Sequence, residues 1–206
     1  MEKEKRHWDT IYQTKKFTEV SWYQPKPEVS LDYIAELNLK KNVPIIDVGG
    51  GDSFLVDFLL AEGYTEITVL DISEKALERA KARLGKQAEK VTWLVADVAN
   101  FKPTAKYELW HDRAAFHFLT HEEEISNYLD TMKNAIIDNA YVILGTFSKN
   151  GPEKCSGLPI KQYAIEDMQK LLPSPFRIIA CENMDHFTPS GGAQNFTFCR
   201  FQKSQK

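Results

Sequence analysis

The stretch Pro44-Ile45-Ile46-Asp47-Val48-Gly49-Gly50-Gly51-Asp52-Ser53 decides how the rest of this chain is organised. It is a short apolar run that ends in an acid and three glycines. An amphipathic segment follows at residues 54–62, and a second apolar run at residues 67–71 ends in Asp71. The pattern predicts a strand, a glycine turn, a helix and a second strand that ends in an acid. Such a unit binds nucleoside-bearing ligands at the carboxyl edge of a parallel sheet.

The glycines and Asp71 suit such a ligand for separate physical reasons. A chain that passes from strand to helix with almost no loop needs backbone angles that side chains forbid, and bare backbone also lets a ligand come close. Asp71 follows Gly51 by twenty residues, and a carboxylate there can accept both hydroxyl protons of a ribose. A tight turn with a solvated acid is the alternative. The second acid, placed at a strand end, favours the nucleoside site.

Two common phosphate-binding turns do not fit the same stretch. The dinucleotide pattern needs a third glycine where Phe54 stands, and no Gly-Lys-Ser/Thr follows the glycines. The pattern Asp47-x-Gly49-x-Gly51-x-Ser53 instead resembles the first motif of the class I S-adenosylmethionine-dependent methyltransferases. That motif usually ends in Gly, whereas this chain has Ser53, a small residue that can cap a helix.

Composition narrows the class of protein. The chain has 206 residues and a net charge of −3, which suits one globular domain and does not predict a nucleic-acid partner. Its three cysteines predict no disulfide framework and fit a reducing compartment. The charged N-terminus has no apolar segment behind it, and no run approaches the ~20 apolar residues that span a bilayer. We expect a cytoplasmic protein with no membrane partner, and we assign no metal site and no oligomeric state.

The N-terminal part, residues 1–40, is expected to form a cap or lid on a core at residues 44–206. Residues 3–13 suit a short helix that carries His7, Trp8 and Tyr12. Trp22 and Tyr23 come next, in a segment that two prolines keep irregular. Aromatic residues there either pack as an anchor or lie over a ligand, and both possibilities stay open.

Further elements follow at regular intervals along the core. A helix is expected after Ser30, and another from the cap residue Ser73 to about residue 84, with Gly85 beyond it. Thr120 and Glu123 suggest a capping box before a third helix. The remaining expected strands are at 91–95, 107–111, 140–147, 176–182 and 196–201, with a helix at 165–172, a long connection at 148–162 and a turn at 185–193.

This order resembles the class I methyltransferase fold over essentially the whole chain. The resemblance implies an α/β, three-layer Rossmann-like domain with a seven-stranded sheet whose last strand is antiparallel. Because the carboxyl ends of parallel strands share one edge, the loop after residue 111, the 148–162 connection and the 185–193 hairpin are expected to rim one pocket. The Trp22-Tyr23 segment is placed to close it.

The resemblance also implies a cofactor, S-adenosyl-L-methionine, and a role for each motif residue. Asp47 belongs to the first motif, and Asp97 follows the third strand, where an ordinary loop aspartate is the alternative. In the family pattern Gly49, Gly50 and Gly51 pass under the methionine and ribose, Asp71 binds the ribose, Ile72 and Val98 enclose the adenine, Asp97 binds its amine, and Asp112 lies near the methionyl end.

The acceptor of the methyl group is not identified by the sequence. Asp112-Arg113-Ala114-Ala115 stands where enzymes that methylate adenine or glutamine carry Asn/Asp-Pro-Pro-Tyr/Phe, which leaves a small molecule or a protein side chain. The Trp22-Tyr23 pair, with His111-Asp112-Arg113, is similar to a bacterial subgroup and to eukaryotic protein-lysine methyltransferases. Trp22 or Tyr23 is a candidate to face the sulfonium or a cationic acceptor.

A general base matters only if the acceptor must lose a proton, because positioning supplies much of the rate. Asp112, His117 and His186 are the candidates, and a structural role is an equal alternative for each histidine. Two other functions stay open: a nicotinamide-dependent oxidoreductase, disfavoured by Phe54, and a non-catalytic scaffold that binds the cofactor.

Overall fold

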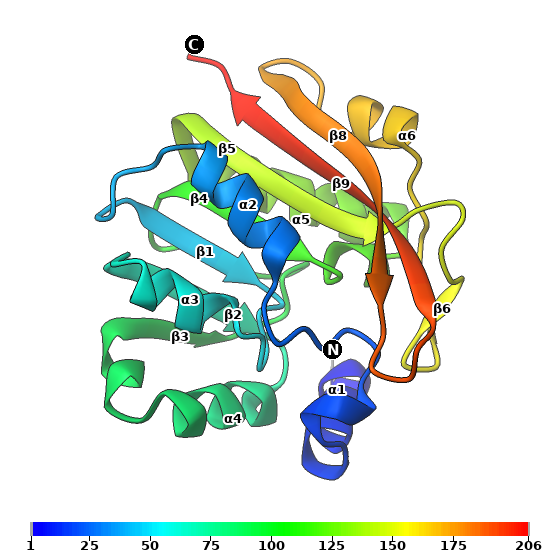
Figure 1. Ribbon diagram of the computed structural model, residues 1–206. Coiled ribbons are helices and arrows are strands. Elements are labelled where there is room, and N and C mark those ends of the chain that lie inside the picture. Colours follow the sequence, from blue (N-terminus) through cyan, green and yellow to red (C-terminus); the bar gives the residue numbers. More distant parts are fainter. Residues whose placement is uncertain (1, 206) are drawn as a thin grey trace.

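The computed structural model describes residues 2–205, and a seven-stranded sheet runs through it (Figure 1). The strand order is β3-β2-β1-β4-β5-β9-β8. Strands β1 to β5 pair in parallel, whereas β9 is antiparallel to both of its neighbours, β5 and β8. The expected α/β fold with an antiparallel last strand is therefore confirmed.

Helices separate most strands of the seven-stranded sheet along the chain, whereas β4 follows β3, and β9 follows β8, without a helix between them. The helices are α1 (Glu2–Thr14), η1 (Phe17–Glu19), α2 (Glu28–Glu36), α3 (Leu55–Ala61), α4 (Glu74–Leu84), η2 (Gly85–Lys90), η3 (Phe116–Phe118), α5 (Glu122–Ala135) and α6 (Ile165–Leu171). The strands are β1 (Pro44–Val48), β2 (Glu66–Asp71), β3 (Val91–Val95), β4 (Tyr107–Arg113), β5 (Ile136–Phe147), β6 (Lys154–Cys155), β7 (Leu158–Pro159), β8 (Phe176–Phe187) and β9 (Ala193–Lys203).

The sheet separates two apolar clusters, one on each face. Successive side chains of a strand point to opposite faces, so Ile45 and Ile46 in β1 enter different clusters. Helices α2 and α3 cover the face on which Ile45 lies, and helices α5 and α6 cover the face on which Ile46 lies (Figure 1). Strands buried on both faces are mostly apolar, which is why β1 is apolar except for Asp47 and β5 is apolar at residues 141–144.

Helix ends follow the capping residues closely. Ser73 accepts a hydrogen bond from the Ala76 N–H, and α4 ends at Gly85, as expected. The capping box at α5 is displaced by one residue from the expected Thr120–Glu123 pair, because Glu124 accepts the His121 N–H at 3.4 Å.

The connection at residues 148–162 has more structure than its sequence suggests. Strands β6 and β7 form a small antiparallel hairpin within it, with Cys155 opposite Leu158. Strand β8 extends to Phe187 and β9 begins at Ala193, so the expected turn at 185–193 is shorter than predicted. The hairpin folds because its two halves supply partners for each other's backbone groups.

Two of the three cysteines are paired. Cys181 and Cys199 lie directly opposite each other in β8 and β9 and form a disulfide, whereas Cys155 is free and buried. The cysteine count predicted no disulfide framework, and the structure has this one bond. The pairing depends on strand register, which the cysteine count does not contain.

Helix α1 and residues 15–27 do not belong to the helix layers that cover the two faces of the sheet, whereas α2 does. Leu31 and Ile34 of α2 are part of the buried cluster on its face of the sheet. We refer to residues 2–27, the part of the expected 1–40 segment that precedes α2, as the cap. No helix within residues 2–205 combines the length and the apolar character needed to cross a membrane.

Candidate active site

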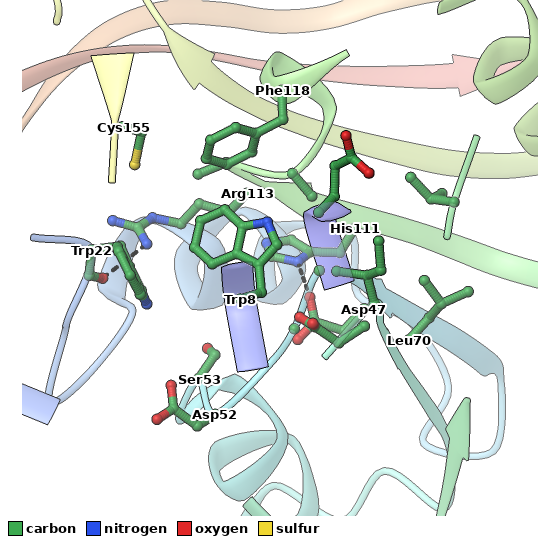
Figure 2. A pocket seen from close by; sticks show the side chains of 18 of the residues that line it. Trp8, Trp22, Asp47, Asp52, Ser53, Leu70, His111, Arg113, Phe118 and Cys155 are labelled. Atoms are coloured by element: carbon green, nitrogen blue, oxygen red, sulfur yellow. Dashed lines mark hydrogen bonds and ion pairs between the residues drawn. The ribbon is translucent and has the colours of Figure 1, made fainter. Parts of the chain in front are cut away.

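A cavity of about 350 Å³ opens where the parallel strands end (Figure 2). Its walls come from the glycine turn after β1 and from the residues that follow β2, β3 and β4. The N-terminal cap and the β6–β7 hairpin complete it. The 148–162 connection thus rims the pocket as expected, but no residue of the 185–193 hairpin lines it.

The turn after β1 has no room for side chains. Gly49 has φ +65°, and a Cβ atom built on it would lie 2.4 Å from Cβ of Ala115. The N–H groups of Gly49 and Gly50 both donate to the carbonyl of Leu70, at 2.7 and 3.2 Å, which holds the turn against the end of β2. Gly49 and Gly50 line the cavity, as predicted from the motif.

Gly51 completes the same turn. It has φ +48° and is not among the residues that line the cavity. A Cβ atom there would lie 2.8 Å from the Tyr12 hydroxyl and 3.1 Å from Oδ2 of Asp71. Gly51 therefore lets Tyr12, from the cap, approach the end of β2.

Asp71 is buried at the end of β2 and lines the cavity. Its Oδ1 accepts the Ser73 N–H at 2.7 Å, so the carboxylate is fixed by the start of α4. Burial raises the pKa of Asp71 to about 7, and the nearby charges of Asp52 and Asp47 add to the rise. A carboxyl group whose pKa is raised by burial in a pocket is typical of a binding site.

Ile72, Asp97 and Val98 also line the cavity, next to Asp71. The carbonyl of Asp71 accepts the Ala96 N–H at 3.0 Å and so joins the two strand ends. The Asp97 carboxylate accepts the Ala99 N–H at 3.0 Å and an Asn100 side-chain N–H at 2.8 Å. These bonds orient Asp97 at the edge of the pocket and leave lone pairs for a further donor.

Asp47 takes part in a chain of buried polar groups that the sequence did not predict. Oδ1 of Asp47 lies 2.7 Å from Nδ1 of His111, and Nε2 of His111 lies 2.9 Å from the Ser30 hydroxyl. All three residues line the cavity. A carboxylate only accepts hydrogen bonds, so Nδ1–H of His111 donates to Asp47. The chain ties β1, β4 and α2 together beneath the pocket.

The cap supplies an aromatic wall. Trp22 and Tyr23 line the cavity, in agreement with their expected position. Trp8 and Tyr12 do so as well, and Trp8 packs edge-on against Trp22 and Phe118 at ring-centre distances of 5.8 and 5.0 Å (Figure 2). The four-residue spacing of Trp8 and Tyr12 on one helix face was the sequence signal that could have identified them.

Arg79 of α4 holds the cap in place. Its guanidinium donates to the carbonyls of Tyr12 and Lys15, at 3.0 and 2.8 Å, and pairs with Asp52 at 3.1 Å. Asp9 of α1 accepts from the Ser73 hydroxyl at 2.7 Å. Helix α1 is therefore attached to the elements that carry Asp71.

Phe54 has a structural task in the same region. Its ring packs against Phe17 and Tyr23 of the cap, and the Arg83 guanidinium lies 4.1 Å from the ring centre. The preceding Ser53 accepts the Leu55 N–H at 3.1 Å, but the N-cap position of α3 is Phe54 and not Ser53 as expected. The ring stands at the start of α3, where a dinucleotide site needs glycine.

Asp112, which the family pattern places near the methionyl end, is not among the residues that line the cavity. The carboxylate is fully buried and accepts the N–H groups of Ala115 and Phe116 and the Tyr128 hydroxyl, the last at 2.7 Å. Burial raises its pKa to about 6. Side chains of β4 alternate, so His111 and Arg113 line the cavity while Asp112 faces α5.

The two histidine candidates for a general base are also outside the cavity lining. His117 is fully buried, its Nδ1 accepts the Phe147 N–H at 3.3 Å, and burial lowers its pKa to about 3. His186 donates from Nε2 to the Ser21 carbonyl at 2.6 Å and so steadies the segment that carries Trp22. Each histidine hydrogen-bonds to a backbone group, as a structural histidine does.

The fold and this cavity define a Rossmann-like domain of the methyltransferase type. A family model described as a methyltransferase domain matches residues 45–139. An S-adenosylmethionine-dependent methyltransferase from Anabaena variabilis superposes with a TM-score of 0.76 at 15% identity, covering 98% of this chain and 94% of that one. A Burkholderia thailandensis 1,6-didemethyltoxoflavin N1-methyltransferase gives 0.72 at 14% identity, with 98% and 85% covered. These likenesses show the fold.

Curated relatives extend the match in sequence. Malonyl-[acyl-carrier protein] O-methyltransferase 2 of Ilyobacter polytropus is 24% identical over 149 residues, which are 67% of this chain and 56% of the relative. A mouse eEF1A lysine and N-terminal methyltransferase is 27% identical over 122 residues, 58% of this chain and 17% of that one. The chain spans about half the length, or less, of these relatives. The methyltransferase family model itself covers residues 45–139, a little under half of the chain.

Proposed function

We propose that this protein transfers a methyl group from S-adenosyl-L-methionine to a small molecule or a protein side chain. The observation that carries the proposal is the row of groups along one side of the cavity: the glycine turn, Asp71 at the end of β2, and Asp97 at the end of β3. Asp71 binds the ribose hydroxyls, Asp97 binds the adenine amine, and Ile72 and Val98 enclose the adenine.

The charges of this side of the cavity suit the cofactor. Asp47, Asp52 and Asp71 lie close enough that the first two raise the pKa of the third. S-adenosylmethionine carries a sulfonium and an ammonium group, so its binding relieves this repulsion among carboxylates. A pyrophosphate would add negative charge here, and Phe54 occupies the position where its helix contact needs glycine. Both features disfavour a nicotinamide dinucleotide.

Catalysis is then a matter of position. In methyl transfer a lone pair of the acceptor forms a bond to the methyl carbon while the carbon–sulfur bond breaks, and its electron pair stays on sulfur. Trp22 and Tyr23 of the cap line the cavity beside Trp8, and an aromatic face there attracts a sulfonium. The relatives' printed names describe an O-methyltransferase and a lysine and N-terminal methyltransferase. An ionised carboxylate already offers a lone pair and needs little more than orientation, whereas an ammonium group must first lose a proton.

The experiment is transfer of label from methyl-tritiated S-adenosylmethionine into an extract of the expression host, separated afterwards into small-molecule and protein fractions. The proposal predicts label in one fraction, reduced at least tenfold in Asp71→Ala. Lys75→Ala is the matched control, because Lys75 lies on the adjoining helix and its side chain pairs with Glu78 away from the pocket. Cofactor binding without label in either fraction would favour the non-catalytic scaffold.

A further inference from the structure

Arg113 is a cavity residue that the cofactor site leaves unused. It ends β4 and lines the pocket, where its Nη1 donates to the Trp22 carbonyl at 3.1 Å (Figure 2). Its guanidinium carbon lies 5.1 Å from the centre of the Phe196 ring. Its Nη2 is buried and has no hydrogen-bond partner among the described residues.

The guanidinium also lacks a counter-ion. Within residues 2–205, no carboxylate lies within ion-pair distance of Arg113, whereas Arg79, Arg83 and Arg200 each pair with one. Burial lowers the pKa of Arg113 to about 10, so the group is still charged at neutral pH. A charge held away from water without a partner costs free energy, and an anionic ligand group recovers it.

Four of the carboxylates that line the cavity, those of Asp47, Asp52, Asp71 and Asp97, come from the ends of β1, β2 and β3, where the cofactor is expected. Glu4 of α1 and Glu124 of α5 line it as well, and Asp47 is near enough to favour the charged form of Arg113. Arg113 comes from β4 and faces other elements: the Trp22 segment of the cap and Phe196 of β9. The positive charge therefore lies in the part of the pocket that the cofactor motif does not form.

We propose that Arg113 binds an anionic oxygen group, such as a carboxylate, on the methyl acceptor, while Trp8, Trp22 and Phe118 hold the acceptor's apolar body. The planar guanidinium suits a carboxylate because two parallel N–H groups match its two oxygens. The inference rests on the proposed function and names the substrate class of the same site. A carboxylate of the cofactor itself is the competing source of the same chemistry.

The test is calorimetric titration of the full chain saturated with S-adenosylhomocysteine. Two probe pairs differ mainly in charge: benzoate against benzamide, and malonate against malonamide, at constant ionic strength. We expect at least one of the two carboxylates to bind and its neutral partner to bind at least tenfold more weakly. Arg113→Gln is expected to lose tenfold or more of the carboxylate affinity while its affinity for S-adenosylhomocysteine stays within about threefold.

His186→Ala is the matched control. It removes the hydrogen bond to Ser21 and so loosens the same cap segment without removing the cavity's arginine. We expect this variant to keep carboxylate binding within about threefold. A further readout does not depend on a variant: the side-chain nitrogen resonances of Arg113 in the wild-type protein shift on addition of the carboxylate and not of the amide.

Three results would overturn the inference. Neither carboxylate binds the S-adenosylhomocysteine complex, or Arg113→Gln binds them as the wild type does, or Arg113→Gln loses affinity for S-adenosylhomocysteine but not for its decarboxylated analogue. The last result would assign Arg113 to the cofactor's own carboxylate. Failure of the wild type to bind S-adenosylhomocysteine at all would instead contradict the proposed function.

Discussion

Neighbouring residues at the end of β4 have different surroundings because strand side chains alternate in direction. His111 and Arg113 line the cavity, and Asp112 between them is buried on the other side with Tyr128. The sequence places an acid at this strand end but does not say which way it points. Strand β4 extends to Arg113, beyond its expected end at residue 111, so the expected loop position of Asp112 became a strand position.

Tyr128→Phe tests the structural assignment of Asp112. The Tyr128 hydroxyl donates to Asp112 at 2.7 Å and accepts from Trp110 at 2.8 Å, and all three groups are buried. Its removal leaves two buried polar groups short of a partner, so we expect the free energy of unfolding to fall by ~2 kcal/mol. Urea denaturation measures this change. Calorimetry should show that the variant binds S-adenosylhomocysteine with an affinity within about threefold of wild type. A large loss of that affinity would indicate that Asp112 contributes to cofactor binding.

The raised pKa of Asp71, about 7, predicts a pH dependence of cofactor binding. Only the ionised carboxylate accepts both ribose hydroxyls, so affinity for S-adenosylhomocysteine should rise as pH increases from 6 to 8 and then level. Titrations across that range check this, and Asp71→Asn should remove most of the dependence. An unchanged profile in Asp71→Asn would show that another group titrates.

Stability of the ligand-free protein should change in the opposite sense. Because the folded pKa of Asp71 lies above its ordinary value of 3.8, the folded state holds the proton more tightly than the unfolded chain. The contribution of this group to the free energy of unfolding is therefore present at low pH and declines as pH rises towards 7. Comparing the wild type with Asp71→Asn by urea denaturation at several pH values isolates it from the other groups.

At the scale of elements, attachment of the cap depends on α4. Arg79 donates to two carbonyls near the end of α1, and the sequence offered only an alternating charged helix face there. A contact between residues 64 to 67 positions apart is set by the fold and not by local pattern. The cap was expected from the Trp22-Tyr23 segment, but its anchor was not.

Arg79→Ala should release α1 while leaving the sheet intact. Charge-assisted hydrogen bonds of this kind contribute ~1.5–3 kcal/mol, so amide exchange in residues 2–14 should accelerate about tenfold or more. Exchange measured by mass spectrometry, with Lys75→Ala as a control on the same helix, checks this. Equal exchange in the two variants would mean that other contacts hold the cap. Cofactor affinity should fall with the cap's release, because Tyr12 and Trp8 line the same cavity.

At the scale of the molecule, the sequence predicted the sheet well because periodicity and turn residues report local backbone states. Glycine turns, the Ser73 cap and the apolar runs each indicate where along the chain a helix or strand begins or ends. The strand order then follows from right-handed crossovers. The cofactor side of the site was predictable for the same reason, since its residues are next to strand ends. The other side was not: Ser30, Trp8, Cys155 and Arg113 meet there only through tertiary packing.

The measurement that tests the central claim most directly is calorimetric titration of the full chain with S-adenosylmethionine and, separately, with NAD, repeated with Asp71→Ala. The account predicts saturable binding of S-adenosylmethionine, at least tenfold weaker in the variant, and no binding of NAD. Circular dichroism of the variant should match the wild type, so that the loss reports on the site and not on folding. Binding of NAD without binding of S-adenosylmethionine would contradict the account.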